Sequence, residues 1–88
     1  MSLSKKKKPV KVEIYSKPDC HLCDEAKVVL LGVQSRYWFE ITEVDITRDQ
    51  AIYQEYKEQI PVVFIDGSKA FKYRVDEAEF VRKLKRLL

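Results

Sequence analysis

The chain has 88 residues, of which 45% are hydrophobic and 35% charged, and its formal net charge is +3. This length is enough for one compact domain with a core of its own, and it excludes a second domain. No apolar stretch approaches the ~20 residues of a membrane-spanning helix, and the segment Met1 to Lys11 is too polar and basic for the apolar part of a signal peptide. We therefore expect a cytoplasmic protein in a reducing compartment, with no membrane partner.

Basic residues gather near both ends of the chain. One cluster is Lys5 to Lys8, and the other consists of Arg82, Lys83, Lys85 and Arg86. Neither cluster requires nucleic acid, because terminal charged runs are usually solvated and cations in the last turns of a helix favour its dipole. We predict a basic tail over residues 1–9, a single domain over residues 10–88, and no nucleic-acid partner.

The first predicted elements are a strand and a helix. Residues 10–15 alternate between apolar and more polar side chains, which is the period-two pattern of a strand. After a short loop, Asp19 is a candidate N-cap for a helix that begins at Cys20. Apolar residues recur at helical spacing as far as Gly32, which can adopt the left-handed conformation that ends a helix.

The middle of the chain predicts a second strand and a second helix. An imperfect alternation over residues 39–45 indicates the strand. Thr47, with Gln50 three residues later, has the form of a capping box. We therefore expect a helix with its N-cap at Thr47, running through Tyr56 and ending before Pro61, which breaks the helical pattern.

The last part of the chain predicts a hairpin and a third helix. The unbroken apolar run over residues 62–65 is typical of a strand buried on both faces. Asp66-Gly67 is a strong two-residue turn signal, so residues 69–73 should return antiparallel. Asp76 should cap a final helix, whose expected inward face is Phe80, Val81, Leu84 and Leu87.

The only two cysteines, Cys20 and Cys23, lie at the expected head of the first helix. A thiol there faces unpaired backbone N–H groups and the positive end of the helix dipole, which favours the thiolate. A second sulfur three residues on can attack the mixed disulfide that the first one forms. A structural zinc site is less favoured, because it needs four ligands and the sequence adds only His21. A structural disulfide is also less favoured, because closing so short a loop gains little.

Three stretches of the sequence form a pattern around the cysteine pair. They are Ile14-Tyr15-Ser16-Lys17 leading to Cys20-His21-Leu22-Cys23, then Glu43-Val44-Asp45-Ile46-Thr47, and then Ile60-Pro61-Val62-Val63-Phe64-Ile65-Asp66-Gly67. In the element order β-α-β-α-β-β-α, they resemble the thioredoxin superfamily and the glutaredoxins in particular. The resemblance implies an α/β, thioredoxin-like fold of the glutaredoxin type, with a mixed four-stranded sheet flanked by helices.

The resemblance also implies roles for individual residues. Cys20 matches the attacking cysteine of the family, and Cys23 matches the resolving one. Pro61 matches a cis-proline that faces the dithiol and leaves the backbone of Ile60 free to pair with an extended thiol substrate. Lys17 matches a basic residue that meets a glutathione carboxylate; the alternative is a plain solvated lysine.

Other positions depart from the glutaredoxin pattern. His21 stands where glutaredoxins commonly carry proline, and a protonated imidazole there would stabilise the Cys20 thiolate, although an exposed His can also be simply solvated. The Gly-Gly turn that precedes the glutamyl site of many glutaredoxins is missing. The resemblance implies that Asp76 keeps the acidic contact of that site, but Arg74 and Val75 fill space that glycine would leave open.

We therefore predict a monomeric thiol-disulfide oxidoreductase that acts on protein disulfides or glutathione mixed disulfides. It requires no organic cofactor or metal, and glutathione is a candidate co-substrate. The missing glycines favour a protein reductase as the source of electrons, whereas the retained Lys17 favours glutathione. Two alternatives stay open: a homodimer that carries a 2Fe-2S cluster through Cys20 and glutathione, and a thioredoxin-fold binding module.

Overall fold

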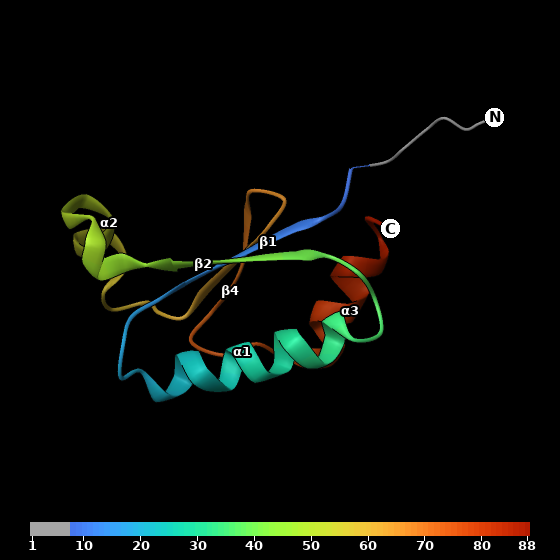
Figure 1. Ribbon diagram of the computed structural model, residues 1–88, viewed down its shortest axis with the longest axis horizontal. Helices are drawn as coiled ribbons and strands as arrows, with labels where there is room; N and C mark the ends of the chain where they lie inside the picture. Colours follow the sequence, from blue (N-terminus) through green and yellow to red (C-terminus); the bar gives the residue numbers. More distant parts are fainter. Residues whose placement is uncertain (1–7) are drawn as a thin grey trace.

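The computed structural model describes residues 8–88, so residues 1–7 of the predicted basic tail lie outside the described residues. Its strands are β1 (Lys11–Ser16), β2 (Glu40–Asp45), β3 (Val62–Ile65) and β4 (Ser68–Lys72). Its helices are α1 (His21–Gln34), α2 (Gln50–Tyr56) and α3 (Glu77–Lys85), with a short 3-10 turn at Ile46–Arg48. The predicted order β-α-β-α-β-β-α is confirmed (Figure 1).

The four strands form one mixed sheet in the order β2-β1-β3-β4. β1 pairs in parallel with β2 and antiparallel with β3, and β4 pairs antiparallel with β3. The parallel pair is joined through α1, because parallel strands need a crossover connection, whereas β3 and β4 share a tight turn. The predicted mixed four-stranded sheet is therefore confirmed, with β1 and β3 in its interior.

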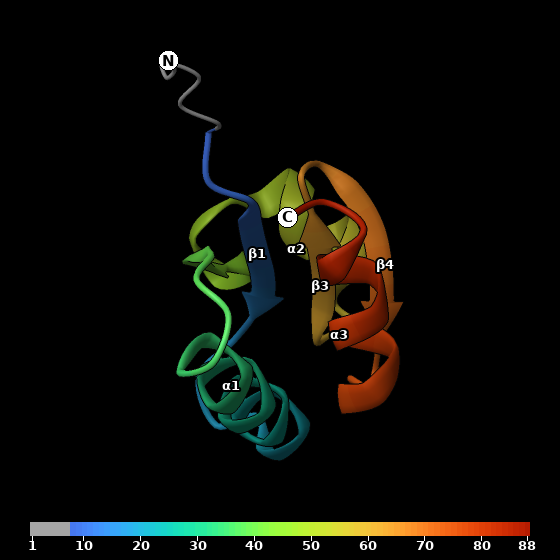
Figure 2. The same cartoon turned by 90° about the vertical axis from the view of Figure 1, so that its right-hand side faces the viewer.

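Alternation along β1 separates the two faces of the sheet. Val12 and Ile14 belong to the main core, together with side chains of α1 and α3 such as Leu30 and Phe80. The next side chain along the strand, Tyr15, faces the other side, and its ring lies 5.0 Å from the ring of Tyr56 in α2, centroid to centroid. Thus α1 and α3 lie together on one face and α2 covers one end of the other (Figure 1 and Figure 2).

Both ends of α1 differ from the sequence prediction. Cys20, and not Asp19, is the N-cap, because its sulfur accepts a hydrogen bond from the backbone N–H of Cys23 at 3.2 Å. Asp19 instead has a φ of 60°, a left-handed conformation that Asp tolerates better than most residues. The predicted end at Gly32 is also wrong, since backbone N–H groups beyond it still find helical carbonyls and the helix continues to Gln34.

The second helix begins later than predicted. Asp49 is the N-cap of α2, and its carboxylate accepts the backbone N–H of Ile52 at 3.0 Å. Thr47, the predicted cap, lies in the 3-10 turn, where its hydroxyl donates to the carboxylate of Asp45 at 2.6 Å. The capping-box prediction is wrong because Thr47 is part of the 3-10 turn, and α2 begins only after Asp49 has taken the N-cap position.

The turn between β3 and β4 and the cap of α3 agree with the sequence prediction. Asp66 and Gly67 have φ values of 48° and 86°, as the two central residues of a type I′ hairpin turn require. Asp76 is the N-cap of α3, and its carboxylate accepts the backbone N–H of Glu79 at 2.9 Å. The residues of the turn and of the N-cap are therefore sufficient to predict the hairpin and the start of α3.

The inward face of α3 is predicted correctly except at its last position. Phe80 and Leu84 are completely buried, and Val81 packs against the same core. Leu87 lies beyond Lys85, the last residue of the helix, and is 44% exposed. Helical spacing does not apply there, because the chain has already left the helix.

The two glycines should respond in opposite ways to alanine. A methyl group added at Gly32 or Gly67 would meet no atom within 4 Å, so packing opposes neither change. Gly32→Ala should stabilise the protein by up to about 1 kcal/mol, because glycine is a poor residue inside a helix. Gly67→Ala should destabilise it by about 1 kcal/mol or more, because alanine is strained in the left-handed region. Urea unfolding measures both changes, and equal midpoints for the two variants would contradict them.

Candidate active site

The two cysteines lie at the carboxyl end of β1, where the chain enters α1. β3 runs antiparallel to β1, with Tyr15 opposite Val62. Pro61, the residue before Val62, therefore lies at the same end of the sheet as the loop that leads to Cys20. Strand pairing thus brings Ile60 and Pro61 to the cysteine pair, although they are far apart in the sequence.

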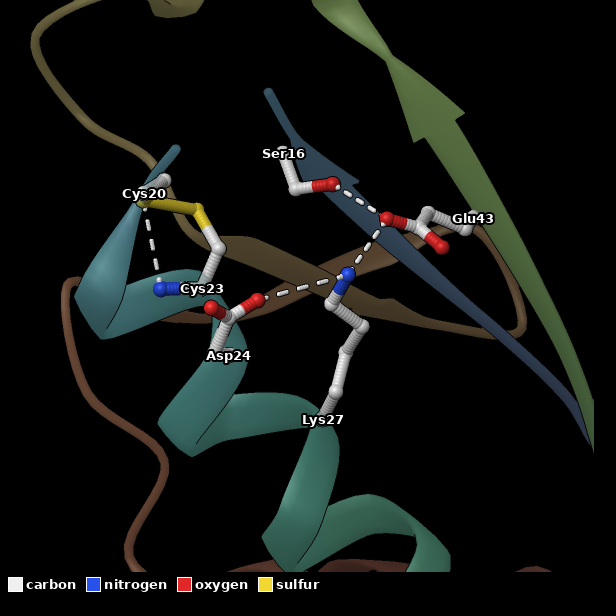
Figure 3. Close-up of a disulfide and its surroundings, with 6 residues drawn as sticks. All are labelled: Ser16, Cys20, Cys23, Asp24, Lys27 and Glu43. Carbon is white, nitrogen blue, oxygen red and sulfur yellow. Dashed lines mark hydrogen bonds and ion pairs between the residues drawn. A yellow bond between two sulfur atoms is a disulfide. The ribbon is translucent and has the colours of Figure 1, made fainter. Parts of the chain in front are cut away.

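The Cys20 and Cys23 sulfurs are at disulfide distance, and the two Cα atoms are 5.2 Å apart (Figure 3). Cys20 is partly exposed at the head of α1, whereas Cys23, in the first turn, has an exposed fraction of 0%. The Cys20 sulfur also accepts the backbone N–H of Cys23. A sulfur in this position faces the positive end of the helix dipole, which stabilises a thiolate once the disulfide is reduced.

Ile60 forms an apolar wall beside the cysteines. It is buried in one cluster with Cys23 and Ile46, and Cys20 packs against that cluster. The peptide bond between Ile60 and the buried Pro61 is cis, as the resemblance implies. The structure therefore brings Ile60 into contact with the cysteine cluster, with Pro61 as the next residue.

Lys17 precedes the cysteine pair in the sequence, His21 lies between the two cysteines, and both side chains are exposed. Lys17 lies in the loop between β1 and α1, before Cys20. The side chain of His21 is 85% exposed, and its Nε2 lies 2.9 Å from a carboxylate oxygen of Glu25, one turn further along α1. Glu25 therefore compensates part of the charge that a protonated His21 would present to Cys20.

A groove of about 320 Å³ lies between α1 and the segment that joins β4 to α3. Leu22, between the two cysteines in the sequence, contributes to its lining, as do Val75 and Asp76. Arg74 lines it as well, and its guanidinium lies 3.8 Å from the carboxylate of Glu25. Asp76 thus borders this groove, but its carboxylate also caps α3, and Arg74 and Val75 present side chains where many glutaredoxins have glycine.

The sequence reasoning missed a hydrogen-bonded network close to Cys23. Lys27 Nζ donates to Oε2 of Glu43 at 2.7 Å, and the hydroxyl of Ser16 donates to the same oxygen at 2.9 Å (Figure 3). Lys27 Nζ also lies 3.7 Å from the carboxylate of Asp24. One signal was available in the sequence, because Lys27 follows Cys23 by four residues and so shares its face of the helix.

This network fixes the charge state of its two main members. Hydrogen bonds from Lys27 and Ser16 hold the pKa of the Glu43 carboxyl below its ordinary value. The hydrogen bond to Glu43 in turn raises the pKa of the Lys27 ammonium. Both groups are therefore charged at neutral pH.

Residues 8–88 contain no helix that is long and apolar enough to cross a membrane. In the same range, no three His, Cys, Asp or Glu side chains are grouped so that they could hold a metal ion. The two cysteines pair with each other.

A CxxC pair at the head of a helix, beside a cis-proline segment on a mixed sheet, defines a protein with a thioredoxin-like fold and fits a thiol oxidoreductase. Comparison with known families agrees, since residues 11–85 match the Glutaredoxin-like domain. Because this match spans nearly the whole chain, the protein belongs to the glutaredoxin-like domain family.

Individual relatives support this assignment. The chain is 25% identical over 87 residues to a glutaredoxin-like protein of Dictyostelium discoideum, which covers 92% of this chain and 81% of the relative. A solution structure of a Nitrosomonas europaea protein matches with a TM-score of 0.77 at 25% identity, covering 93% of this chain and 99% of the other. A thioredoxin of Halobacterium salinarum matches with a TM-score of 0.64 at 18% identity, covering 90% of this chain and 74% of the thioredoxin. At this identity the match shows the shared fold alone.

In the reduced protein, Cys20 should be alkylated at least about ten-fold faster than Cys23 at mildly acidic pH, because it is both accessible and closer to the helix dipole. Iodoacetamide labelling followed by peptide mass spectrometry measures the two rates. Cys23→Ser should keep the fast reaction and Cys20→Ser should lose it. Preferential labelling of Cys23 would overturn the assignment of the attacking sulfur.

The Glu43 network should make stability depend on pH. Since the folded-state pKa of Glu43 is lowered, its carboxylate stabilises the protein above the ordinary pKa of glutamate, and this contribution is lost as the pH falls through the lowered value. Glu43→Gln should therefore be less stable than the wild type at neutral pH, and the difference should disappear in strong acid. Urea unfolding across this pH range measures the difference, and a constant gap would show that the charge of Glu43 is not its cause.

Proposed function

We propose that the protein is a dithiol thiol-disulfide oxidoreductase in which Cys20 attacks the substrate and Cys23 resolves the intermediate. One observation carries the proposal: Cys20 at the head of α1 is partly exposed, and its sulfur lies at bonding distance from the sulfur of the buried Cys23. A substrate can approach the first sulfur from solvent, whereas the second is shielded from it. This asymmetry suits a reaction in which one thiol meets the substrate and the other acts only within the protein.

The proposed reaction has two steps. The Cys20 thiolate attacks a disulfide R–S–S–R′, forms the mixed disulfide Cys20–S–S–R and releases R′–S⁻, which takes up a proton. Cys23 then attacks the Cys20 sulfur, forms the Cys20–Cys23 disulfide and releases R–SH. The substrate gains two electrons, which an external thiol or a reductase returns to the protein. A monomer suffices, since both steps use sulfur atoms of one chain, and no metal or organic cofactor takes part in them.

The groove beside the cysteines favours protein disulfides over glutathione mixed disulfides as substrates. In the glutaredoxins that this chain resembles, a glycine pair leaves room for the glutamyl end of glutathione. Here Arg74 and Val75 line the groove, and Arg74 lies 3.8 Å from Glu25 on the opposite side. Lys17 remains exposed and can meet a carboxylate, so we propose that glutathione binding is weakened rather than lost.

Cys20→Ser should lower the rate of protein disulfide reduction by at least about 100-fold, because a serine hydroxyl does not replace a thiolate nucleophile. Cys23→Ser should still complete the first step and accumulate a mixed disulfide, since only the resolving sulfur is missing. Insulin reduction with dithiothreitol measures the turnover, and intact-mass spectrometry detects the trapped adduct. Equal turnover by the wild type and Cys20→Ser would contradict the proposed function.

The glutathione site should be recoverable by restoring the glycines. The double variant Arg74→Gly with Val75→Gly should increase deglutathionylation of a glutathionylated peptide, whereas its insulin reduction should change little. In that assay, Lys17→Ala should raise KM and leave kcat nearly unchanged, as for the loss of uniform binding. Wild-type turnover comparable to that of a Gly-Gly glutaredoxin, assayed alongside, would show that Arg74 and Val75 do not exclude glutathione. A coupled assay with glutathione and glutathione reductase, compared with one that uses thioredoxin reductase, then identifies the electron donor.

A further inference from the structure

The second step of the proposed reaction requires an ionised sulfur in unfavourable surroundings. Cys23 must lose its proton to attack the mixed disulfide, yet its side chain is fully buried and packs with Ile46 and Ile60. Apolar surroundings oppose the formation of a thiolate. A positive charge held close to Cys23 would reduce this cost. The inference below therefore rests on the proposed dithiol function.

Lys27 can provide such a charge from the same helix. It follows Cys23 by one turn of α1, the spacing at which two side chains are neighbours on one face. Figure 3 shows both side chains extending from α1 toward the sheet. The side chain of Lys27 is only 33% exposed, so water screens its charge less than that of a fully solvated lysine.

Glu43 and Ser16 hold the Lys27 ammonium in place. The hydroxyl of Ser16, which is 1% exposed at the end of β1, donates to Glu43 Oε2, and the same oxygen accepts from Lys27 Nζ at 2.7 Å. The lowered pKa of Glu43 keeps this carboxyl ionised at neutral pH, so Glu43 is a poor acceptor for the Cys23 proton. The charge of Lys27, rather than proton transfer to Glu43, is therefore the means by which this network can influence Cys23.

The other titratable groups near Cys23 are carboxyl, phenol and thiol groups, none of which can carry a positive charge. Burial raises the pKa of Tyr15, which keeps its phenol neutral. Among these neighbours within the described residues, only Lys27 carries a full positive charge at neutral pH. Asp24, Lys27 and Glu43 lie around the cysteine pair in Figure 3, and Cys20, Tyr15, Tyr53 and Tyr56 pack against the cluster that contains Cys23.

We propose that Lys27, held by Glu43 and Ser16, is a positioning residue that favours the Cys23 thiolate during resolution. In this step Cys23–SH and Cys20–S–S–R become the Cys20–Cys23 disulfide and R–SH, so the Cys23 proton ends on the departing sulfur. The Lys27 ammonium stabilises the negative charge on the Cys23 sulfur while that proton is absent. Lys27 keeps its own proton throughout.

Dithiodipyridine separates the two steps in the reduced protein. One equivalent should release thiopyridone first in a concentration-dependent phase from Cys20 and then in a unimolecular phase from Cys23. Lys27→Met should slow the second phase about three-fold or more at neutral pH and move its pH profile to higher pH, because the stabilising charge is gone. The first phase should stay unchanged, since Lys27 lies two turns from Cys20. Lys27→Arg keeps the charge and should restore the wild-type profile.

The ion pair between Arg36, just after α1, and Glu77 of α3 offers a matched control, with the same 2.7 Å separation. Arg36→Met should leave both phases unchanged. Circular dichroism checks folding, and Lys27→Gln replaces Lys27→Met should the latter not fold. If the second phase of the variant without the Lys27 charge were as fast as in the wild type, or if its pH profile moved to lower pH, the proposal would be overturned. Absence of a second phase in the wild type would instead contradict the dithiol function itself.

Discussion

The hydrogen bond from the backbone N–H of Cys23 to the Cys20 sulfur serves two purposes at once. It satisfies one of the N–H groups that the first turn of α1 leaves without a helical partner. It also holds the sulfur that we propose as the attacking one at the positive end of the helix dipole. Because the cap and the proposed nucleophile are the same atom, a change that moves the start of α1 also moves that sulfur. The left-handed conformation of Asp19 directs the chain from β1 into this position.

The directions of the strands supply the rest of the site. The parallel pairing of β1 with β2 brings Ser16 and Glu43 to the same end of the sheet, and the antiparallel β3 begins there with Ile60 and Pro61. Ser16, Glu43 and Ile60 therefore reach the surroundings of Cys23 from β1, from β2 and from the start of β3. The strand register therefore determines where the apolar wall and the ionic network lie around the buried Cys23. The head of α1 determines only the position of the more exposed Cys20.

Period and turn chemistry were sufficient to predict most elements, such as the alternating strand that carries Ile14 and the hairpin turn at Asp66. They failed at the starts of two helices, where several neighbouring side chains can serve as the N-cap, so that Cys20 and Asp49, rather than the predicted residues, became the N-caps. The contact between Lys27 and Glu43 depends on how β2 lies beside α1, which no local pattern specifies. The cis bond at Pro61 was implied only by the family resemblance, because most X–Pro bonds in folded proteins are trans.

The activation of Cys20 by the head of α1 is tested most directly by an ultraviolet titration of its thiolate in the Cys23→Ser protein. This variant keeps the backbone N–H that the Cys20 sulfur accepts and leaves Cys20 as the only thiol. We expect half of Cys20 to be ionised at a pH clearly below that of a free cysteine thiol. Half-ionisation at or above the pH of free cysteine would show that the helix head does not favour the thiolate, and would contradict the assignment of Cys20 as an activated nucleophile.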